Sequence, residues 1–201
     1  MNPTLTLPDV RPLATLCVFL FISSLPVKAS LSPETTTPKT FADWCLNQAN
    51  SSRETLHTIN VMLQEAKTQD CHQAEKLLST LTRLFLSDLQ IADLRPLSSL
   101  TNLTELSLLN NQIADIKPLS TLTKLTKLFI DNNQITDLRP LSTLASLTEL
   151  YLNNNQIADL LPLSDLTKLD LLSLGYNPSL TDKTCPVKPA STCRFVLEKD
   201  Q

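Results

Sequence analysis

The sequence predicts an α/β solenoid, a right-handed superhelix of short stacked units with a parallel sheet on its concave face. A proline, an aspartate and an isoleucine each recur every 22 positions between residues 84 and 177. A fixed period of this length is the signature of stacked supersecondary units. Because such a stack presents a surface more readily than a pocket, function is expected on that surface. The recurring residues are Pro96, Pro118, Pro140 and Pro162; Asp93, Asp115, Asp137 and Asp159; and Ile91, Ile113, Ile135 and Ile157.

The period divides the chain into five predicted parts. Residues 1–29 read as a signal peptide and residues 30–40, which lack apolar content, as a flexible leader. Residues 41–81 are expected to form a helical N-terminal cap, because a stacked repeat exposes the interior of its first rung and needs a different unit to close it. About four and a half rungs follow in residues 82–178. Residues 179–201 are expected to form the C-terminal cap.

The first 29 residues have the features of an export signal. Arg11 supplies the positive charge, residues 13–25 form a short apolar core, and residues 27–29 place small side chains where a signal peptidase reads them. An apolar stretch of about 13 residues is too short to span a bilayer comfortably, so a retained anchor is the less favoured alternative. We expect a secreted or periplasmic monomer with no stable membrane insertion after signal removal.

Composition argues against several classes of function. Glycine occurs once in the chain, and neither GxxxxGK[ST] nor GxGxxG is present, so no phosphate-cradling loop is expected. The balance of 17 basic against 20 acidic residues lacks any Lys/Arg-rich run, so nucleic acid is not an expected partner. No histidine falls within the repeat, and its serines recur with the rungs. We therefore expect neither an enzyme nor a bound cofactor.

Four cysteines follow the predicted signal, and their even number in an exported chain indicates disulfides. Three pairings exist on paper. The cysteines flank the repeat at opposite ends of a rod, so pairing within each end is favoured, since distant sulfurs could not meet. Zinc ligation by Cys45 and Cys71 with His57 and His72 is the alternative, although we expect no metal site. The favoured disulfides are Cys45–Cys71 and Cys185–Cys193.

Three helices are expected in the N-terminal cap. The first carries Phe41, Trp44 and Cys45. The second begins at Ser51, where Glu54 three residues on completes a capping box, and the third begins at Asp70, with Gln73 in the same relation. The positions expected to be buried are Leu56, Ile59, Leu63 and Ala66 in the second helix and Ala74, Leu77, Leu78 and Leu81 in the third.

The second rung reads LTELSLLNNQI (residues 103–113) and matches L-x-x-L-x-L-x-x-N-x-L at every fixed position. The chain thus resembles the leucine-rich repeat proteins, and its 22-residue unit resembles the class found in bacterial internalin-like proteins. The resemblance implies a bacterial source and a repeat that binds other molecules, although fold alone does not specify function. Strands are expected at 84–86, 106–108, 128–130, 150–152 and 172–174.

The recurring polar residues have structural explanations. An asparagine where the chain turns off each strand can satisfy buried backbone groups on adjacent rungs, because its amide both donates and accepts. Leu89 takes this place in the first rung, so the ladder should begin one rung late. Each proline suits the first turn of a short convex helix, and each aspartate a local turn. A Ca²⁺ site is the alternative for the aspartates, but they lie one to a rung. The ladder residues are Asn111, Asn133, Asn155 and Asn177.

Outward-facing strand positions form three columns on the concave face. The central column contains the aromatics Phe85, Phe129 and Tyr151, and exposed aromatics are enriched at binding hot spots. The alternative is that strands tolerate aromatics and that the cap covers Phe85. The column before it alternates in charge, which is typical of cross-strand ion pairs. The candidate binding residues are Phe85, Glu105, Ser107, Lys127, Phe129, Asp131, Glu149, Tyr151, Asn153 and Ser173.

These features predict a non-enzymatic, exported module that binds a protein partner through the concave face. The alternative is a structural component of a cell-envelope assembly with no dedicated ligand site on that face. A saccharide-binding role would predict more exposed Trp and Tyr side chains than Tyr151 alone.

Overall fold

The computed structural model describes residues 39–195. The predicted signal peptide (1–29) and its cleavage site therefore lie outside the described residues, as do nearly all of the leader and residues 196–201. Within the described part, no helix is both long and apolar enough to cross a membrane.

The N-terminal cap contains helices α1 (Phe41–Leu46), α2 (Arg53–Glu65) and α3 (Cys71–Leu78). The predicted start of the second helix at Ser51 is wrong by one residue. Ser51 instead closes a preceding 3₁₀ turn, and Ser52 is the N-cap, its side chain accepting the Thr55 N–H at 3.2 Å. Asp70 caps α3 as predicted, accepting two backbone N–H groups from the first turn.

The caps bury most of the expected apolar residues. Ile59, Leu63 and Ala66 are buried in α2, and Ala74 and Leu78 in α3. Leu77, however, is 44% exposed, contrary to the prediction. Because α3 is short, only a narrow stripe with a spacing of four residues faces the core, and Leu77 lies one position off that stripe. Leu56 and Leu81 are half-buried.

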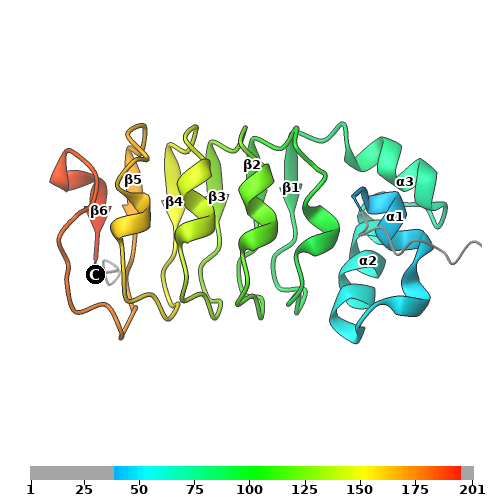
Figure 1. Cartoon of the computed structure of the whole chain (residues 1–201), viewed down its shortest axis with the longest axis horizontal. Helices are drawn as coiled ribbons and strands as arrows, with labels where there is room; N and C mark the ends of the chain where they lie inside the picture. Colours follow the sequence, from blue (N-terminus) through cyan, green and yellow to red (C-terminus); the bar gives the residue numbers. More distant parts are fainter. Residues whose placement is uncertain (1–38, 196–201) are drawn as a thin grey trace, which may run out of the picture. The chain divides into compact units, whose positions relative to one another are not determined.

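Six strands form one parallel sheet in chain order (Figure 1). Five of them begin and end one residue before the predicted bounds. The second core aliphatic residue of each rung lies just after the last residue of the strand. The two-residue strand β6 was not predicted, because it comes from the non-repeated C-terminal cap. The strands are β1 (Arg83–Phe85), β2 (Glu105–Ser107), β3 (Lys127–Phe129), β4 (Glu149–Tyr151), β5 (Leu171–Ser173) and β6 (Cys193–Arg194).

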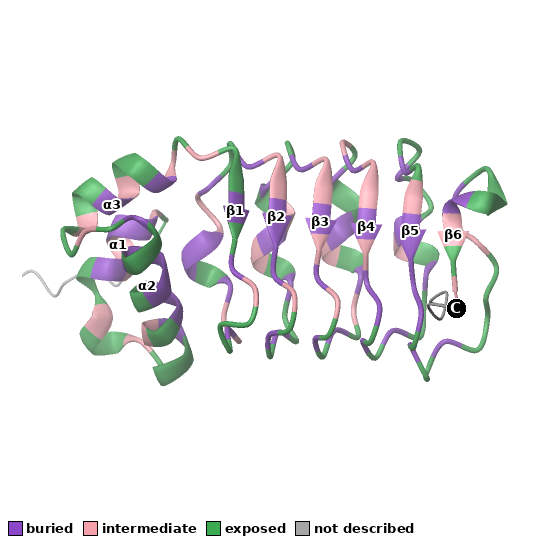
Figure 2. Ribbon diagram, turned by 180° about the vertical axis from the view of Figure 1, so that it is seen from behind, coloured by how far each residue is buried: buried purple, intermediate pink, exposed green. Residues whose placement is uncertain are grey.

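The sheet forms one layer of the stack and short 3₁₀ turns form the other. Figure 1 shows the turns in front of the strands, and Figure 2 shows the sheet from behind, with a buried residue at the centre of each of β1 to β5. Leucine and isoleucine side chains from every rung fill the space between the layers. The turns are η2 (Arg95–Leu97), η3 (Lys117–Thr121), η4 (Arg139–Thr143) and η5 (Leu161–Leu163).

Each convex turn begins in the same way. A proline lies at the first or second helical position, where its missing N–H costs no hydrogen bond. The recurring aspartate three residues earlier accepts the backbone N–H two residues further on, at 2.8–2.9 Å, in all four rungs. This is the predicted local turn role. Each aspartate carboxylate accepts a hydrogen bond from the backbone of its own rung.

The asparagines form the expected ladder through the buried turns. Each side-chain nitrogen donates to a carbonyl oxygen of the preceding rung at 2.8–3.1 Å, and each oxygen accepts the N–H of the isoleucine of that rung at 2.9–3.1 Å. The ladder begins with Asn111, which also accepts the N–H of Leu89 in the first rung. The asparagine side chains therefore pair buried backbone groups of neighbouring rungs.

Both favoured disulfides are present. Cys45 of α1 is bonded to Cys71 at the start of α3, and Cys185 to Cys193 of β6. The zinc alternative is wrong, since Cys45 and Cys71 have no thiolate to offer a metal. In residues 39–195, no group of three or more His, Cys, Asp or Glu residues is placed to hold a metal ion.

Candidate binding face

The parallel register aligns the predicted columns. Each residue in a strand pairs with the residue 22 positions on, so Phe129 lies opposite Tyr151, and Lys127 opposite Glu149. We use the term sheet face for the outward-pointing side chains of β1 to β5 together with the residue two places after each strand. All ten candidate binding residues lie on this face, but they differ in how far a partner could reach them.

The charged column forms the expected cross-strand ion pairs. Arg83 Nε lies 3.3 Å from a Glu105 carboxylate oxygen, and Lys127 Nζ lies 2.5 Å from Glu149. The hydrogen bond to Glu149 raises the pKa of the Lys127 ammonium. These groups are exposed or half-exposed, so water screens each pair and its contribution to stability is small. The column is therefore largely self-neutralised.

The aromatic column contains one stacked pair and one exposed ring. Phe129 and Tyr151 stack with ring centroids 4.8 Å apart, and both are half-buried. Phe85 is 55% exposed, so the alternative that the cap covers it is wrong. The reason is that α1 and α2 pack against the convex turn η2, on the other layer of the stack. An apolar ring thus remains open to solvent at the first strand.

Three of the polar candidates are buried. Ser107, Asn153 and Ser173 are only 5–7% exposed, contrary to the expectation that they face the solvent freely. Ser107 and Ser173 are small side chains beside the aromatic residues of the central column, which leave them little access to water. The Ser107 hydroxyl lies 2.8 Å from that of Ser87, so its hydrogen-bonding capacity is used within the face.

Asn153 is the centre of a hydrogen-bond network that sequence reasoning did not detect. Its backbone and side-chain N–H groups donate to Asp131 at 2.6 and 2.7 Å. Its side-chain oxygen accepts from the Ser173 hydroxyl and from the Gly175 N–H, at 2.9 and 2.7 Å. Burial raises the pKa of the Asp131 carboxyl. Asp131, Asn153 and Ser173 therefore stiffen the face next to the Phe129–Tyr151 pair. They have few hydrogen-bonding groups left for a partner.

The remaining accessible residues give the face its chemistry. They are an exposed phenylalanine, a stacked aromatic pair and two neutralised ion pairs. Arg83, whose side chain is 70% exposed beside Phe85, lies in the predicted charged column, although it was not a candidate. The only feature of the sequence that pointed to Arg83 was the alternation of charge along this column, where Glu105 follows it. The arrangement suits contact with an apolar surface bordered by polar groups.

Comparison with known proteins agrees with this architecture. The family model described as Leucine Rich repeats (2 copies) matches residues 79–121 and 102–143. No curated protein matches the chain at a significant level.

Three similar solved structures come from Listeria monocytogenes. Internalin C2 is 40% identical, with a TM-score of 0.56 over 62% of this chain and 54% of its own. Internalin InlF is 33% identical, with a TM-score of 0.58 over 70% of this chain and 42% of its own. The functional domain of InlJ is 23% identical, with a TM-score of 0.56 over 81% of this chain and 40% of its own, and this likeness shows the fold alone. The chain spans about half or less of the length of each.

Proposed function

We propose that this chain, an internalin-like leucine-rich repeat protein, is a non-enzymatic module that binds a protein partner through its sheet face. The observation that carries the proposal is the aromatic column. A folded sheet does not need a phenylalanine that is 55% exposed, and Phe85 shares its column with the Phe129–Tyr151 pair. Exposed aromatic side chains with few rotatable bonds are favoured anchors in protein interfaces.

The chemistry of the face defines the partner surface it would fit. The opposite charges cancel within each of the ion pairs Arg83–Glu105 and Lys127–Glu149. The partner is therefore a nearly neutral, apolar protein surface with a polar border. Five strands about 4.8 Å apart span roughly 19–24 Å, so the footprint is small and affinity from this face alone is modest.

Two features support action outside the cytosol. Both ends of the repeat are held by disulfides, Cys45–Cys71 and Cys185–Cys193, and such bonds persist in oxidising compartments. The sequence of residues 1–29 reads as an export signal. We therefore propose that the chain binds its partner outside the cytosol, after secretion or in the periplasm.

The test removes the aromatic column and keeps the fold. The variant Phe85→Ser/Phe129→Ser/Tyr151→Ser and the wild-type chain are used as immobilised baits against envelope proteins of the source organism. The matched control is Leu161→Ser, which removes a 72% exposed apolar side chain from η5 on the opposite layer. We expect the wild type and the control to retain the same protein, and the triple variant to lose it.

Circular dichroism and thermal melting must first show that the triple variant is folded. Capture of the same partners by a folded triple variant would overturn the proposal. That result would favour the assembly alternative or another face of the molecule.

A further inference from the structure

The fifth rung departs from the repeat at Tyr176. The equivalent residue after each earlier strand has a positive φ angle and a short polar side chain, and φ at Tyr176 is also positive, at 55°. The earlier residues at this position are Asp88, Asn110, Asn132 and Asn154, with φ between 51° and 62°. Aspartate and asparagine tolerate this left-handed conformation because their side chains bond locally, whereas a bulky aromatic residue is disfavoured there.

Burial does not offset this conformational cost. Tyr176 is 59% exposed, so most of its ring faces water. An asparagine would suit the backbone better at this position. A residue that is held in an unfavourable conformation without a packing gain calls for a functional explanation.

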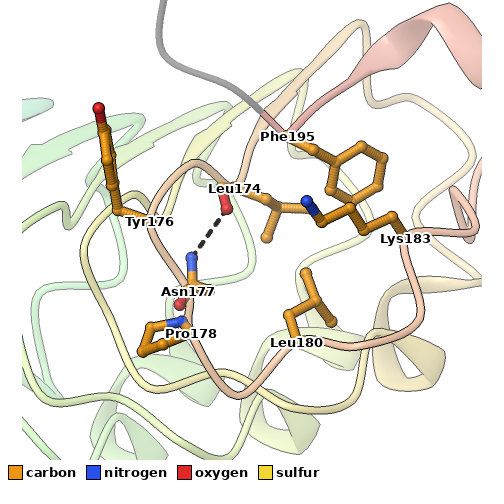
Figure 3. A pocket seen from close by; sticks show the side chains of 7 residues that line it. All are labelled: Leu174, Tyr176, Asn177, Pro178, Leu180, Lys183 and Phe195. Carbon is orange, nitrogen blue, oxygen red and sulfur yellow. Dashed lines mark hydrogen bonds between the residues drawn. The ribbon is translucent and has the colours of Figure 1, made fainter.

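Tyr176 borders a hollow at the C-terminal end of the stack, with a volume of about 610 Å³ (Figure 3). Pockets of this size are typical of binding sites. Figure 3 shows the Tyr176 ring at one edge and the Lys183 side chain extending inward from the opposite edge, between Leu180 and Phe195. The lining residues are Leu174, Tyr176, Asn177, Pro178, Leu180, Lys183 and Phe195.

The charge of the lining is positive. Lys183 is its one ionisable group besides the tyrosine, and within residues 39–195 it forms no ion pair. The neighbouring Asp182 lines a different, smaller hollow, and its carboxylate accepts the Thr184 N–H. An apolar floor with one cation at the rim is complementary to an aliphatic group next to a carboxylate.

We propose that this hollow is a second docking site, separate from the sheet face, for an extended segment of a partner protein that carries an aliphatic side chain followed by an acidic residue. The aliphatic group packs against Leu174 and Leu180, on the side of the hollow that Tyr176 borders. The carboxylate pairs with Lys183. Tyr176 is retained at this position for contact with the partner, at the expense of backbone preference.

The experiment titrates the full chain with either of two peptides blocked at both ends, acetyl-Leu-Leu-Glu-amide or acetyl-Leu-Leu-Gln-amide, up to about 5 mM. Chemical shifts of the protein in NMR spectra report binding. We expect saturable shifts at Tyr176, Leu180 and Lys183, with affinity for the Glu peptide about two- to five-fold higher. Lys183→Gln should remove this preference. The triple sheet-face variant should bind the Glu peptide like the wild type, which separates this site from the proposed function.

The variant Tyr176→Asn distinguishes a binding role for Tyr176 from a structural one. It should raise the melting temperature by about 2–4 °C while weakening the Glu peptide about two- to ten-fold. A lower melting temperature would show that Tyr176 serves packing, and would overturn the proposal. So would equal binding of both peptides or the absence of saturable shifts.

Two further outcomes would assign the hollow to other occupants. If the peptide binds only after the chain is truncated behind Phe195, the occupant is the chain's own end, and the proposal fails. If sedimentation detects a dimer that Tyr176→Asn abolishes, the occupant is a second copy, and the proposal also fails.

Discussion

The aromatic ring of Phe129 stacks on that of Tyr151, with centroids 4.8 Å apart and planes inclined by 22°. The two residues are direct partners in the register of β3 and β4. The Tyr151 hydroxyl also lies 3.5 Å from Glu149, which is itself paired with Lys127. The solenoid thus holds two aromatic side chains in a fixed orientation on the sheet face.

This pair should show a measurable coupling. A double-mutant cycle with Phe129→Ala and Tyr151→Ala, followed by urea unfolding, should give an interaction free energy of about 0.5–1.5 kcal/mol. Within residues 39–195, Phe85 has no aromatic stacking partner, so Phe85→Ala and Tyr151→Ala should be additive to within about 0.5 kcal/mol. Equal coupling in the two cycles would contradict a specific role for the stack.

Adjacent asparagines in the third rung should differ sharply in importance. Asn133 is buried, and its amide donates to Leu108, Ile130 and Asp131 carbonyls and accepts from Ile113. Asn133→Ala should lower the free energy of unfolding by about 3 kcal/mol or more, because it leaves several buried groups unpaired.

The control is the preceding residue, Asn132, which is exposed and has a φ of 56°. Asn132→Gly keeps that conformation accessible and should change the free energy of unfolding by less than about 1 kcal/mol. Chemical denaturation of both variants measures the difference, and similar losses would argue against the buried ladder as the source of stability.

Arg95 should be more important than its equivalent two rungs on. It pairs with Asp93, donates to Thr55 of α2 at 2.8 Å, and lies 5.1 Å above the Trp44 ring of α1. Arg95→Ala should therefore lower the free energy of unfolding by about 2–3 kcal/mol, since it leaves the Asp93 side chain, only 13% exposed, without its cation.

Arg139 provides the matched control. It forms the same pair with Asp137, but the two side chains are 80% and 45% exposed. Arg139→Ala should lower the free energy of unfolding much less than Arg95→Ala does, because water screens an exposed ion pair. If thermal and urea unfolding give the same loss for both variants, Arg95 does not join the cap to the repeat.

Asp131 should make the protein's stability depend on pH in the opposite sense to a carboxylate whose pKa is lowered, such as Asp137. Burial raises its pKa above the ordinary value of 3.8, so the folded chain binds this proton more tightly than the unfolded chain. The contribution of Asp131 to stability therefore falls as pH rises through and above that value. Asp131→Asn should be more stable than wild type at pH 7, and the difference should vanish below about pH 3.

Urea unfolding from pH 3 to pH 7 measures this difference. Carboxyls such as Asp137, whose pKa the Arg139 hydrogen bond lowers, act in the opposite sense in both proteins and cancel. A variant that is less stable than wild type at pH 7 would mean that the carboxylate charge itself strengthens the bonds from Asn153.

Sequence alone was sufficient wherever a residue repeats. The period placed the prolines, the ladder and the strand register, because each rung must present the same groups to the next one. It could not show that Ser107 and Asn153 are buried, since that depends on the particular side chains of neighbouring rungs. The period did not predict a role for Tyr176, although it interrupts a column of Asp and Asn, because a positive φ at that column follows from the turn geometry and not from the repeat motif.

The C-terminal strand β6 has a consequence for solubility. An uncovered sheet edge presents unpaired N–H and C=O groups to which another chain can add. β6 covers the edge of β5 with only two residues, too few to template a further strand, and the Cys185–Cys193 bond holds it there. Reducing that one bond would free the β5 edge, so resistance to edge-to-edge aggregation depends on an oxidising environment.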